Sequence, residues 1–526
     1  MSRTSVILRN IASNWVGFGI NAAVTLALTP FVLSELGAAR YGIWILTGSI
    51  IGYYGFLDLG FRAGVTQYLT RYLAVRDFRR ASECMSSAVA VLAALGGLML
   101  ALSLGAAYLA PRLFRVPPEM THEAFWCILI VGASTAIQFS LNPYGSVFTA
   151  TQRFDLANGI GVVTRLLTAG AVVFSLKMGQ GLIGVSLATC AVSALDYVIR
   201  WRVATRLAPQ VQVSSRFVSL ASVREVGVFG AWNSLIAVNQ FVYQHVPNIL
   251  IAAVMPIAAV GHYALATGLT RHLNAILGPL PAVLYPAATE LHMQGDRGRL
   301  ERLYHDGSRM TMLVMVPLVL VAGFWAADFY RLWVGDRYVS HGQFESVAVL
   351  FRVLLICTVT SYACSTAQQI LIGAGRVRIV AISLISASAV NLTLSALLIR
   401  EFGLIGVAIA TVAASAAIDM IALPLLLQRC VGLSLGQFAR RACVRPLIAG
   451  ALQFLVIVGV RSIAPANTWP RLVAQCGIAA LVCAVFLVIA GLDASERQRL
   501  IVAPLRRWRA RLFPASQSHL VSLGTD

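Results

Sequence analysis

The most constraining feature of the sequence is a nine-residue segment that occurs twice. GLIGVSLAT, at residues 181–189, returns 222 positions later as GLIGVAIAT, at residues 403–411, with seven of the nine residues identical. Two further pairs of sites keep nearly the same offset: Tyr41 with Tyr263, and VFTATQR (147–153) with ILIGAGR (370–376). Because three separate sites hold this register, the sequence predicts two homologous halves.

Composition places most of the chain in lipid. Of its 526 residues, 58% are hydrophobic and 12% charged, and the mean hydropathy is +0.78, which leaves too little polar surface for a soluble protein of this size. A helix needs about 20 apolar residues to cross a hydrocarbon core of roughly 30 Å. About fourteen such runs occur, near 13–34, 41–60, 86–110, 124–146, 157–176, 181–199, 227–253, 259–286, 308–333, 345–372, 379–400, 404–428, 446–464 and 472–492. We therefore expect an all-α integral membrane protein.

The runs divide into two lobes of six spans and a remainder. The lobes are expected at residues 1–225 and 226–432, and residues 433–526 hold two further spans and a basic tail. Because six is even, both lobes enter the membrane from the same side, so they are expected to form a parallel repeat with an axis along the membrane normal. Such a repeat in an apolar chain is typical of transporters, whose two lobes enclose a central path.

The net charge of +20 follows the expected topology. Of the 41 lysine and arginine residues, 29 fall in segments on the side of the N-terminus and nine on the opposite side. This asymmetry over short loops predicts that both termini are cytoplasmic. The first apolar run is expected to be an uncleaved span. No nucleic-acid partner is expected, because no soluble domain remains to present a basic face.

Two basic segments, 70–83 and 291–309, mix arginine with apolar residues at helical spacing. This pattern predicts amphipathic helices lying on the anionic membrane surface. The nine cysteines form no CxxC pair, so neither a metal site nor a cofactor is expected. The short loops leave no room for a catalytic domain, and we do not expect an enzyme.

Several segments resemble the polysaccharide-transporter branch of the multidrug, oligosaccharidyl-lipid and polysaccharide (MOP) exporter superfamily. ARYGIWILTGSIIGYYGFLDLGFRAGVTQYL (39–69) is similar to that branch's second span, and VFTATQRF (147–154) to the exit of its fourth. The openings at Gly181 and Gly403 are similar to those of its sixth and twelfth spans. The branch contains the lipid-linked oligosaccharide flippases of bacterial envelopes.

The resemblance implies a MATE/MOP-like, V-shaped bundle in the bacterial inner membrane. By alternating access it would move an undecaprenyl-diphosphate-linked oligosaccharide from the cytoplasmic to the periplasmic leaflet, for export of exopolysaccharide or surface polysaccharide. The partners implied are this lipid-linked oligosaccharide, membrane lipid and a polysaccharide polymerase or assembly complex. The alternatives are a MATE-type drug or cation antiporter and a membrane polysaccharide polymerase or ligase, which the short outer loops disfavour.

A diphosphate cargo requires buried guanidinium groups, which bind phosphate oxygens in pairs and are otherwise costly in a span. Four arginines meet this requirement: Arg271, Arg62, Arg352 and Arg165. Three of the four have an alternative role. Arg62 can form an interfacial salt bridge with Asp58 four residues earlier, and the long side chains of Arg165 and Arg352 can reach an interface.

Carboxylates and amides complete the candidate site. Asp58, Asp196 and Asp419 lie in or near spans, where a carboxylate either binds a coupling ion or neutralises an arginine. The seventh span carries more polar groups than a lipid-facing helix tolerates, and we expect them to line the path and contact sugar. They are Asn239, Gln240, Tyr243, Gln244 and His245. Hydrogen bonding between helices is the alternative role for this group.

Overall fold

The computed structural model describes residues 3–58, 61–340, 342–432, 438–463 and 465–486. For residues 3–12, 56, 58, 228–243, 439, 463 and 486 it describes the backbone alone. Over these ranges the regular structure consists of α-helices with short 3-10 and π segments, so the protein is all-α as expected.

The first half of the chain forms seven α-helices. Its elements are α1 (Arg3–Gly52), η1 (Tyr53–Asp58), α2 (Phe61–Ala74), α3 (Phe78–Leu113), η2 (Pro118–Met120), α4 (Thr121–Leu141), α5 (Pro143–Ala150), α6 (Phe154–Lys177), α7 (Gly181–Leu207) and η3 (Ser215–Phe217).

The second half and the remainder form eleven more. They are α8 (Leu220–Val254), α9 (Ile257–Leu277), α10 (Pro279–Ala282), α11 (Leu284–Met293), α12 (Arg297–Phe324), α13 (Ala326–Val334), η4 (Asp336–Tyr338), α14 (Val347–Gly373), α15 (Val377–Ala416), η5 (Ala417–Ala422), α16 (Leu423–Val431), η6 (Ala439–Cys443), α17 (Val444–Ile463) and α18 (Trp469–Phe486).

Two of these helices change direction at a glycine. In α1 the backbone leaves the helical region at Gly37, and in α15 it does so at Gly403, both with positive φ. The amide of Asn391 donates to the hydroxyl of Thr411, 20 residues further along, so α15 folds back on itself at Gly403. Such a conformation is easily adopted only by glycine.

Nine helical stretches in the described part of the chain are long and apolar enough to cross a membrane. Two of these stretches, 13–55 and 377–431, contain the turning points at Gly37 and Gly403. The chain is therefore a multi-pass membrane protein. A total of fourteen spans agrees with this architecture and stays a prediction.

The internal repeat is also visible in the backbone of three pairs of turns. In each pair, a residue of positive φ lies at the corresponding place in both halves. The pairs are Arg76 (58°) and Gly295 (69°), 219 positions apart, Gln152 (57°) and Gly375 (76°), 223 apart, and Gly181 (58°) and Gly403 (55°), 222 apart. The two copies of GLIG thus begin in the same left-handed conformation. The halves share local geometry as well as sequence, and they form a parallel repeat.

The two basic segments expected on the membrane surface are not separate helices, and that prediction is wrong. Residues 70–83 contain the end of α2, a turn and the start of α3, and residues 291–309 contain the same sequence of features between α11 and α12. Asp77 and Asp296 are the reason, because each accepts a hydrogen bond from a backbone N–H three residues later and caps a new helix.

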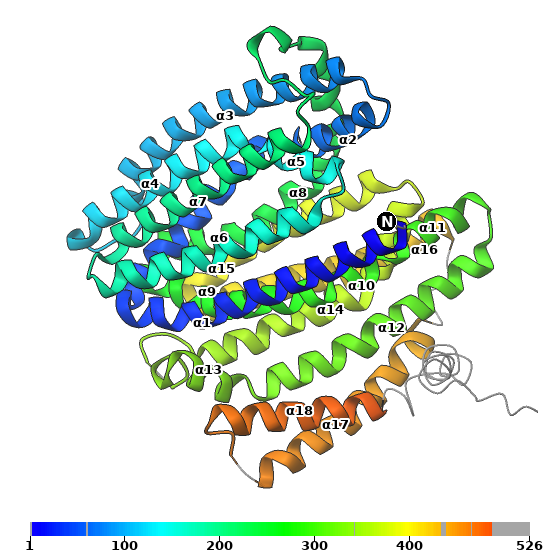
Figure 1. The fold of residues 1–526 in the computed structure, drawn as a ribbon. Coiled ribbons are helices and arrows are strands. Elements are labelled where there is room, and N and C mark those ends of the chain that lie inside the picture. Colours follow the sequence, from blue (N-terminus) through cyan, green and yellow to red (C-terminus); the bar gives the residue numbers. More distant parts are fainter. Residues whose placement is uncertain (1–2, 59–60, 341, 433–437, 464, 487–526) are drawn as a thin grey trace, which may run out of the picture.

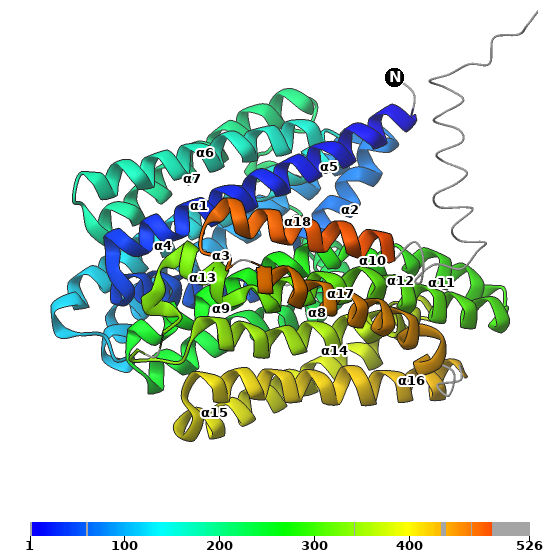
Figure 2. The same cartoon turned by 90° about the horizontal axis from the view of Figure 1, so that it is seen from below.

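The helices run side by side in a tilted bundle, with the N-terminus at the same end as α11 and α16 (Figure 1). We call this end, which carries the turns at 75–77, 151–153, 294–296 and 374–376, the first face. The opposite face carries Gly37, Gly403, the turn at 178–180 and the connecting residues 335–340 and 342–346. Figure 1 shows α17 and α18 outside the bundle, where α17 packs on α12, and Figure 2 views the molecule from the side that they cover.

The buried core of the described residues joins the halves mainly toward the opposite face. One apolar cluster there joins Leu33 and Ile43 of α1 and Leu182 of α7 to Tyr263 of α9 and Phe351 of α14. Toward the first face the described core splits in two. One cluster lies among α2, α3, α5, α7 and the start of α8, and the other among α11, α12, α14, α15 and α16.

Candidate functional site

Arg271 lies on α9 at the junction of the two halves. This helix packs against α1, α8 and α14, and most of its other residues are buried. Arg271 itself is exposed, and Tyr41 of α1 and His245 of α8 lie within electrostatic reach of its guanidinium. It is thus an exposed guanidinium on a helix that packs against three neighbours from both halves.

Arg165 lies on α6 of the first half and faces α1. One of its terminal nitrogens donates a hydrogen bond of 2.7 Å to the Thr25 hydroxyl, while its Nε is buried without a partner. The side chain lines a groove of about 330 Å³ between α1 and α6, together with Asn21, Asn158 and Arg200. A buried donor without a partner, beside a groove that these polar side chains line, is suited to bind an anionic ligand.

Arg165 and Arg271 come from opposite halves of the molecule, and the helices that carry them, α6 and α9, both pack on α1. His272, which follows Arg271 on α9, lies within electrostatic reach of both guanidiniums. The two positive charges repel each other, so an anion bound near both would be favoured electrostatically.

Arg62 lies in a second polar cavity, of about 440 Å³, between α2, α5 and α7. Asp196 lines the same cavity, where its Oδ2 accepts 2.7 Å from the Nε of Arg200 and its Oδ1 accepts 3.0 Å from the Thr164 hydroxyl. Arg200 also lines the groove of Arg165, so the cavity and the groove adjoin. Among the described residues that line the cavity and the groove, three are arginines and one is a carboxylate, so the described lining is net positive.

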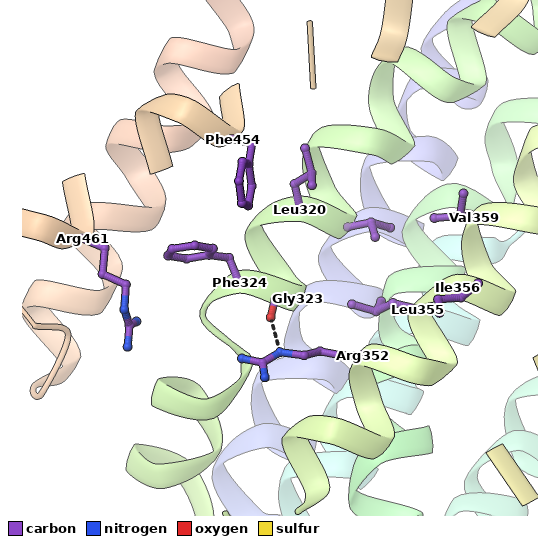
Figure 3. Close-up of a pocket in the computed structure, with 10 residues that line it drawn as sticks. Leu320, Gly323, Phe324, Arg352, Leu355, Ile356, Val359, Phe454 and Arg461 are labelled. Carbon is purple, nitrogen blue, oxygen red and sulfur yellow. Dashed lines mark hydrogen bonds between the residues drawn. The ribbon is translucent and has the colours of Figure 1, made fainter. Parts of the chain in front are cut away.

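Arg352 lies elsewhere. Its Nε donates 2.8 Å to the carbonyl of Gly323, and the side chain lines a groove between α12, α14 and α17 near the opposite face (Figure 3). The structure thus does not bring Arg352 to Arg165 and Arg271.

Asp419 lies in the π segment that follows α15. Its Oδ2 accepts hydrogen bonds of 2.6 Å from the Ser361 hydroxyl and 2.7 Å from the Ser415 hydroxyl. Ser415 in turn contacts Ser361 and Thr360. None of the ion pairs between described residues includes Asp419, so its neighbours there are hydroxyls rather than arginine. π segments inside helices are frequent at functional sites.

The polar face of α8 is described only in part. Gln244 is exposed, and His245 packs directly on Gly52 of α1 with its ring 6.3 Å from that of Tyr53. The buried Asn248 donates 2.9 Å to Ser49, so this end of α8 bonds to α1. The side chains of Asn239, Gln240, Tyr243 and Asp58 lie outside the described residues.

Among the described residues, no group of three or more histidine, cysteine and acidic side chains gathers as a metal site would require. The residues that sequence reasoning did not select are Thr25, Arg200, His272, Ser361 and Ser415. Three of them had a local signal in the sequence: Arg200 follows Asp196 by four residues, Ser415 precedes Asp419 by four, and His272 adjoins Arg271. Thr25 and Ser361 are ordinary side chains that tertiary packing brings to the candidates.

These features define a class: a helical membrane protein with the repeated-lobe fold of transporters and arginines inside the bundle. The chain belongs to the family described as Polysaccharide biosynthesis protein, whose model matches residues 74–341, just over half of its length.

Two curated relatives match almost along their whole length. "Uncharacterized membrane protein EpsK" of Bacillus subtilis (strain 168) is 22% identical over 94% of this chain and 97% of its own. "Putative O-antigen transporter" of Shigella flexneri is 21% identical over 77% of this chain and 93% of its own.

Solved structures show the same fold. An inward-facing MATE-family multidrug resistance transporter of the MOP superfamily matches with a TM-score of 0.67 and 15% identity, covering 78% of this chain and 95% of its own. The lipid II flippase MurJ in an inward closed conformation matches with a TM-score of 0.63 and 15% identity, covering 90% of this chain and 98% of its own. The protein therefore has the MOP-superfamily fold.

Proposed function

We propose that this protein flips an undecaprenyl-diphosphate-linked oligosaccharide from the cytoplasmic to the periplasmic leaflet of the bacterial inner membrane, for export of exopolysaccharide or surface polysaccharide. The observation that carries the proposal is that Arg165 and Arg271 lie on helices of opposite halves, α6 and α9, that both pack on α1. A diphosphate bears about two negative charges, and two guanidiniums in a site of low dielectric bind it through paired, charge-assisted hydrogen bonds.

The family and the relatives support the same cargo class. Polysaccharide biosynthesis needs lipid-linked sugars on the far side of the membrane, and the names of two similar proteins refer to O-antigen transport and to lipid II flipping. The fold alone equally fits a MATE-type antiporter. A cationic drug requires an acidic pocket, and the net positive lining around Arg62, Arg165 and Arg200 favours an anionic cargo.

The movement we propose is a rocking of the lobes, taken as residues 1–225 and 226–432, with 433–526 flanking them. Within the described residues, a large core cluster joins the halves toward the opposite face, whereas toward the first face the core joins them only through the start of α8, which fits a state open to the first face. With both termini cytoplasmic, this is the inward-open state, in which the groove and cavity of Arg165 and Arg62 lead the diphosphate to Arg271. The protein acts as a transporter and not as an enzyme, and it hands its product to a polymerase or assembly complex.

The experiment that tests this function is deletion of the gene followed by extraction of lipid-linked sugars. The proposal predicts loss of surface polymer together with accumulation of a polyprenyl-diphosphate oligosaccharide at the cytoplasmic leaflet. Restoring the intact protein should reverse both effects. Loss of polymer without any accumulated lipid-linked sugar would contradict the proposal.

Asp419 is proposed as the group that couples flipping to an ion gradient, because hydroxyls rather than arginines hold its carboxylate. Asp419→Asn cannot release a proton or offer a charge to sodium, so the flipping rate in vesicles should fall about tenfold or more, to the rate measured without a gradient. Glu401→Gln, which alters an exposed carboxylate, should keep the full rate. Undiminished flipping by the intact protein after collapse of both proton and sodium gradients would rule out this role.

A further inference from the structure

The groove that contains Arg352 is distinct from the site between the lobes. It has a volume of about 510 Å³, within the range of roughly 300–1,000 Å³ typical of small-molecule sites. Its walls come from α12, α14 and α17, and most of them are apolar, including Leu320, Phe324, Val359 and Phe454. Figure 3 shows these side chains along one length of the groove and the two arginines, Arg352 and Arg461, at one end.

The groove opens sideways toward lipid. Ile356 is 51% exposed and Phe454 is 44% exposed, although both lie within apolar helices long enough to cross the membrane. Exposed apolar side chains at that depth face acyl chains rather than water. A hydrocarbon chain can therefore enter the groove from the bilayer and replace the missing contacts along its walls.

Among the described residues at the end of the groove, one cation lacks a carboxylate partner. Arg461 forms a two-pronged ion pair with Asp328, a carboxylate that is only 3% exposed. Arg331 contacts the same carboxylate at 3.7 Å and pairs with Asp336 at 2.9 Å. Two carboxylates thus balance two of the three arginines.

Arg352 is the third arginine. Among the described residues its guanidinium has one hydrogen-bond acceptor, the carbonyl of Gly323, and no carboxylate partner. The carbonyl fixes the Nε edge of the guanidinium, and the terminal nitrogens keep their donors free at the end of the apolar groove (Figure 3). The local excess is a single positive charge, which matches a single phosphodiester better than a diphosphate.

We propose that this groove binds one anionic glycerophospholipid of the outer leaflet, with an acyl chain along Leu320, Val359 and Phe454 and the phosphodiester on Arg352. The lipid fills the wedge between α17 and the lobe formed by α12 and α14. It thereby links the two additional C-terminal helices to the second lobe. The role assigned to Arg352 is lipid binding and not contact with the cargo.

The test is native mass spectrometry of the purified full-length protein in the presence of phosphatidylglycerol or phosphatidylcholine. The intact protein should retain phosphatidylglycerol in preference to phosphatidylcholine. Arg352→Ala removes a charge-assisted contact and should weaken phosphatidylglycerol binding about tenfold, whereas Arg352→Lys should retain part of it. Arg400→Ala, which removes an exposed arginine near the turn at Gly403, should leave binding unchanged.

A second variant keeps the test decisive if Arg352→Ala fails to fold. Ile356→Trp fills the groove without changing any charge and should weaken retention of the same lipid. The proposal is wrong if both Arg352→Ala and Ile356→Trp bind phosphatidylglycerol like the intact protein, or if Arg400→Ala loses as much binding as Arg352→Ala. It is also wrong if polyprenyl phosphate displaces phosphatidylglycerol from the intact protein but not from Arg352→Ala.

Discussion

Replacing Arg271 by alanine should reduce surface polymer by about 10- to 100-fold at an unchanged level of the protein in the membrane, because hydrogen bonds to a charged group contribute about 1.5–3 kcal/mol. The substitution removes one of the two guanidiniums proposed to bind the cargo diphosphate and leaves that group with half of its counter-charge. The lipid-linked precursor should accumulate at the inner leaflet. Quantification of surface polymer and of extracted precursor measures both effects.

Two companion variants separate charge from geometry. Arg271→Lys keeps the charge but cannot form paired hydrogen bonds with phosphate, so its export should fall between those of the intact protein and Arg271→Ala. Arg400→Ala removes an exposed arginine and should export normally. Normal surface polymer in Arg271→Ala would remove this residue from the mechanism.

A second large loss of export is expected from substitution of Gly42, where α1 crosses α9. A Cβ atom added to Gly42 would lie 2.1 Å from the carbonyl oxygen of Ile257, and one added to Gly261 would lie 3.0 Å from the ring of Tyr41 and 3.3 Å from the backbone of Ala38. Glycines on both helices thus allow their backbones to touch. Because the atom facing Gly42 belongs to the backbone, even Gly42→Ala must move a helix.

This crossing holds the two halves together toward the opposite face, so Gly42→Ala should disfavour the state described here and lower export. Overpacking of a close contact costs about 1–3 kcal/mol, which corresponds to an export loss of about 5- to 100-fold if closure limits the cycle. The matched control is Gly48→Ala on the same helix, where a Cβ atom meets nothing within 4 Å. Equal export by the two variants would show that the crossing is not part of the transport cycle.

Much of the fold could be predicted because its determinants are local. The apolar runs predict helices by their length alone. The repeat of GLIG predicts two similar halves, and in the structure Gly181 and Gly403 both have a positive φ. The boundaries were harder to predict. The segments 70–83 and 291–309 have amphipathic spacing, and only the caps at Asp77 and Asp296 reveal that each contains a turn.

The candidate site could be predicted only where a residue type is energetically unfavourable at its position in the chain. Placing an arginine in a membrane span costs free energy, which is why Arg271 and Arg165 could be selected from the sequence. Depth along a helix does not reveal which way a side chain points, so the same reasoning selected Arg352, which lies in another groove. Partners such as Thr25 of Arg165 and Ser361 of Asp419 come from packing between helices that are far apart in sequence, and no local pattern marks them.

The most direct test of the central claim, that arginines of both lobes bind one diphosphate, is a double-mutant cycle with Arg165→Ala and Arg271→Ala. Binding of a polyprenyl-diphosphate oligosaccharide to purified protein would be measured for the two single variants, the double variant and the intact protein. If both guanidiniums bind the same group, each single variant should lose about tenfold or more in affinity and the double variant should lose far less than the product of the two losses. Unchanged affinity in either single variant, or losses that multiply independently, would contradict the account.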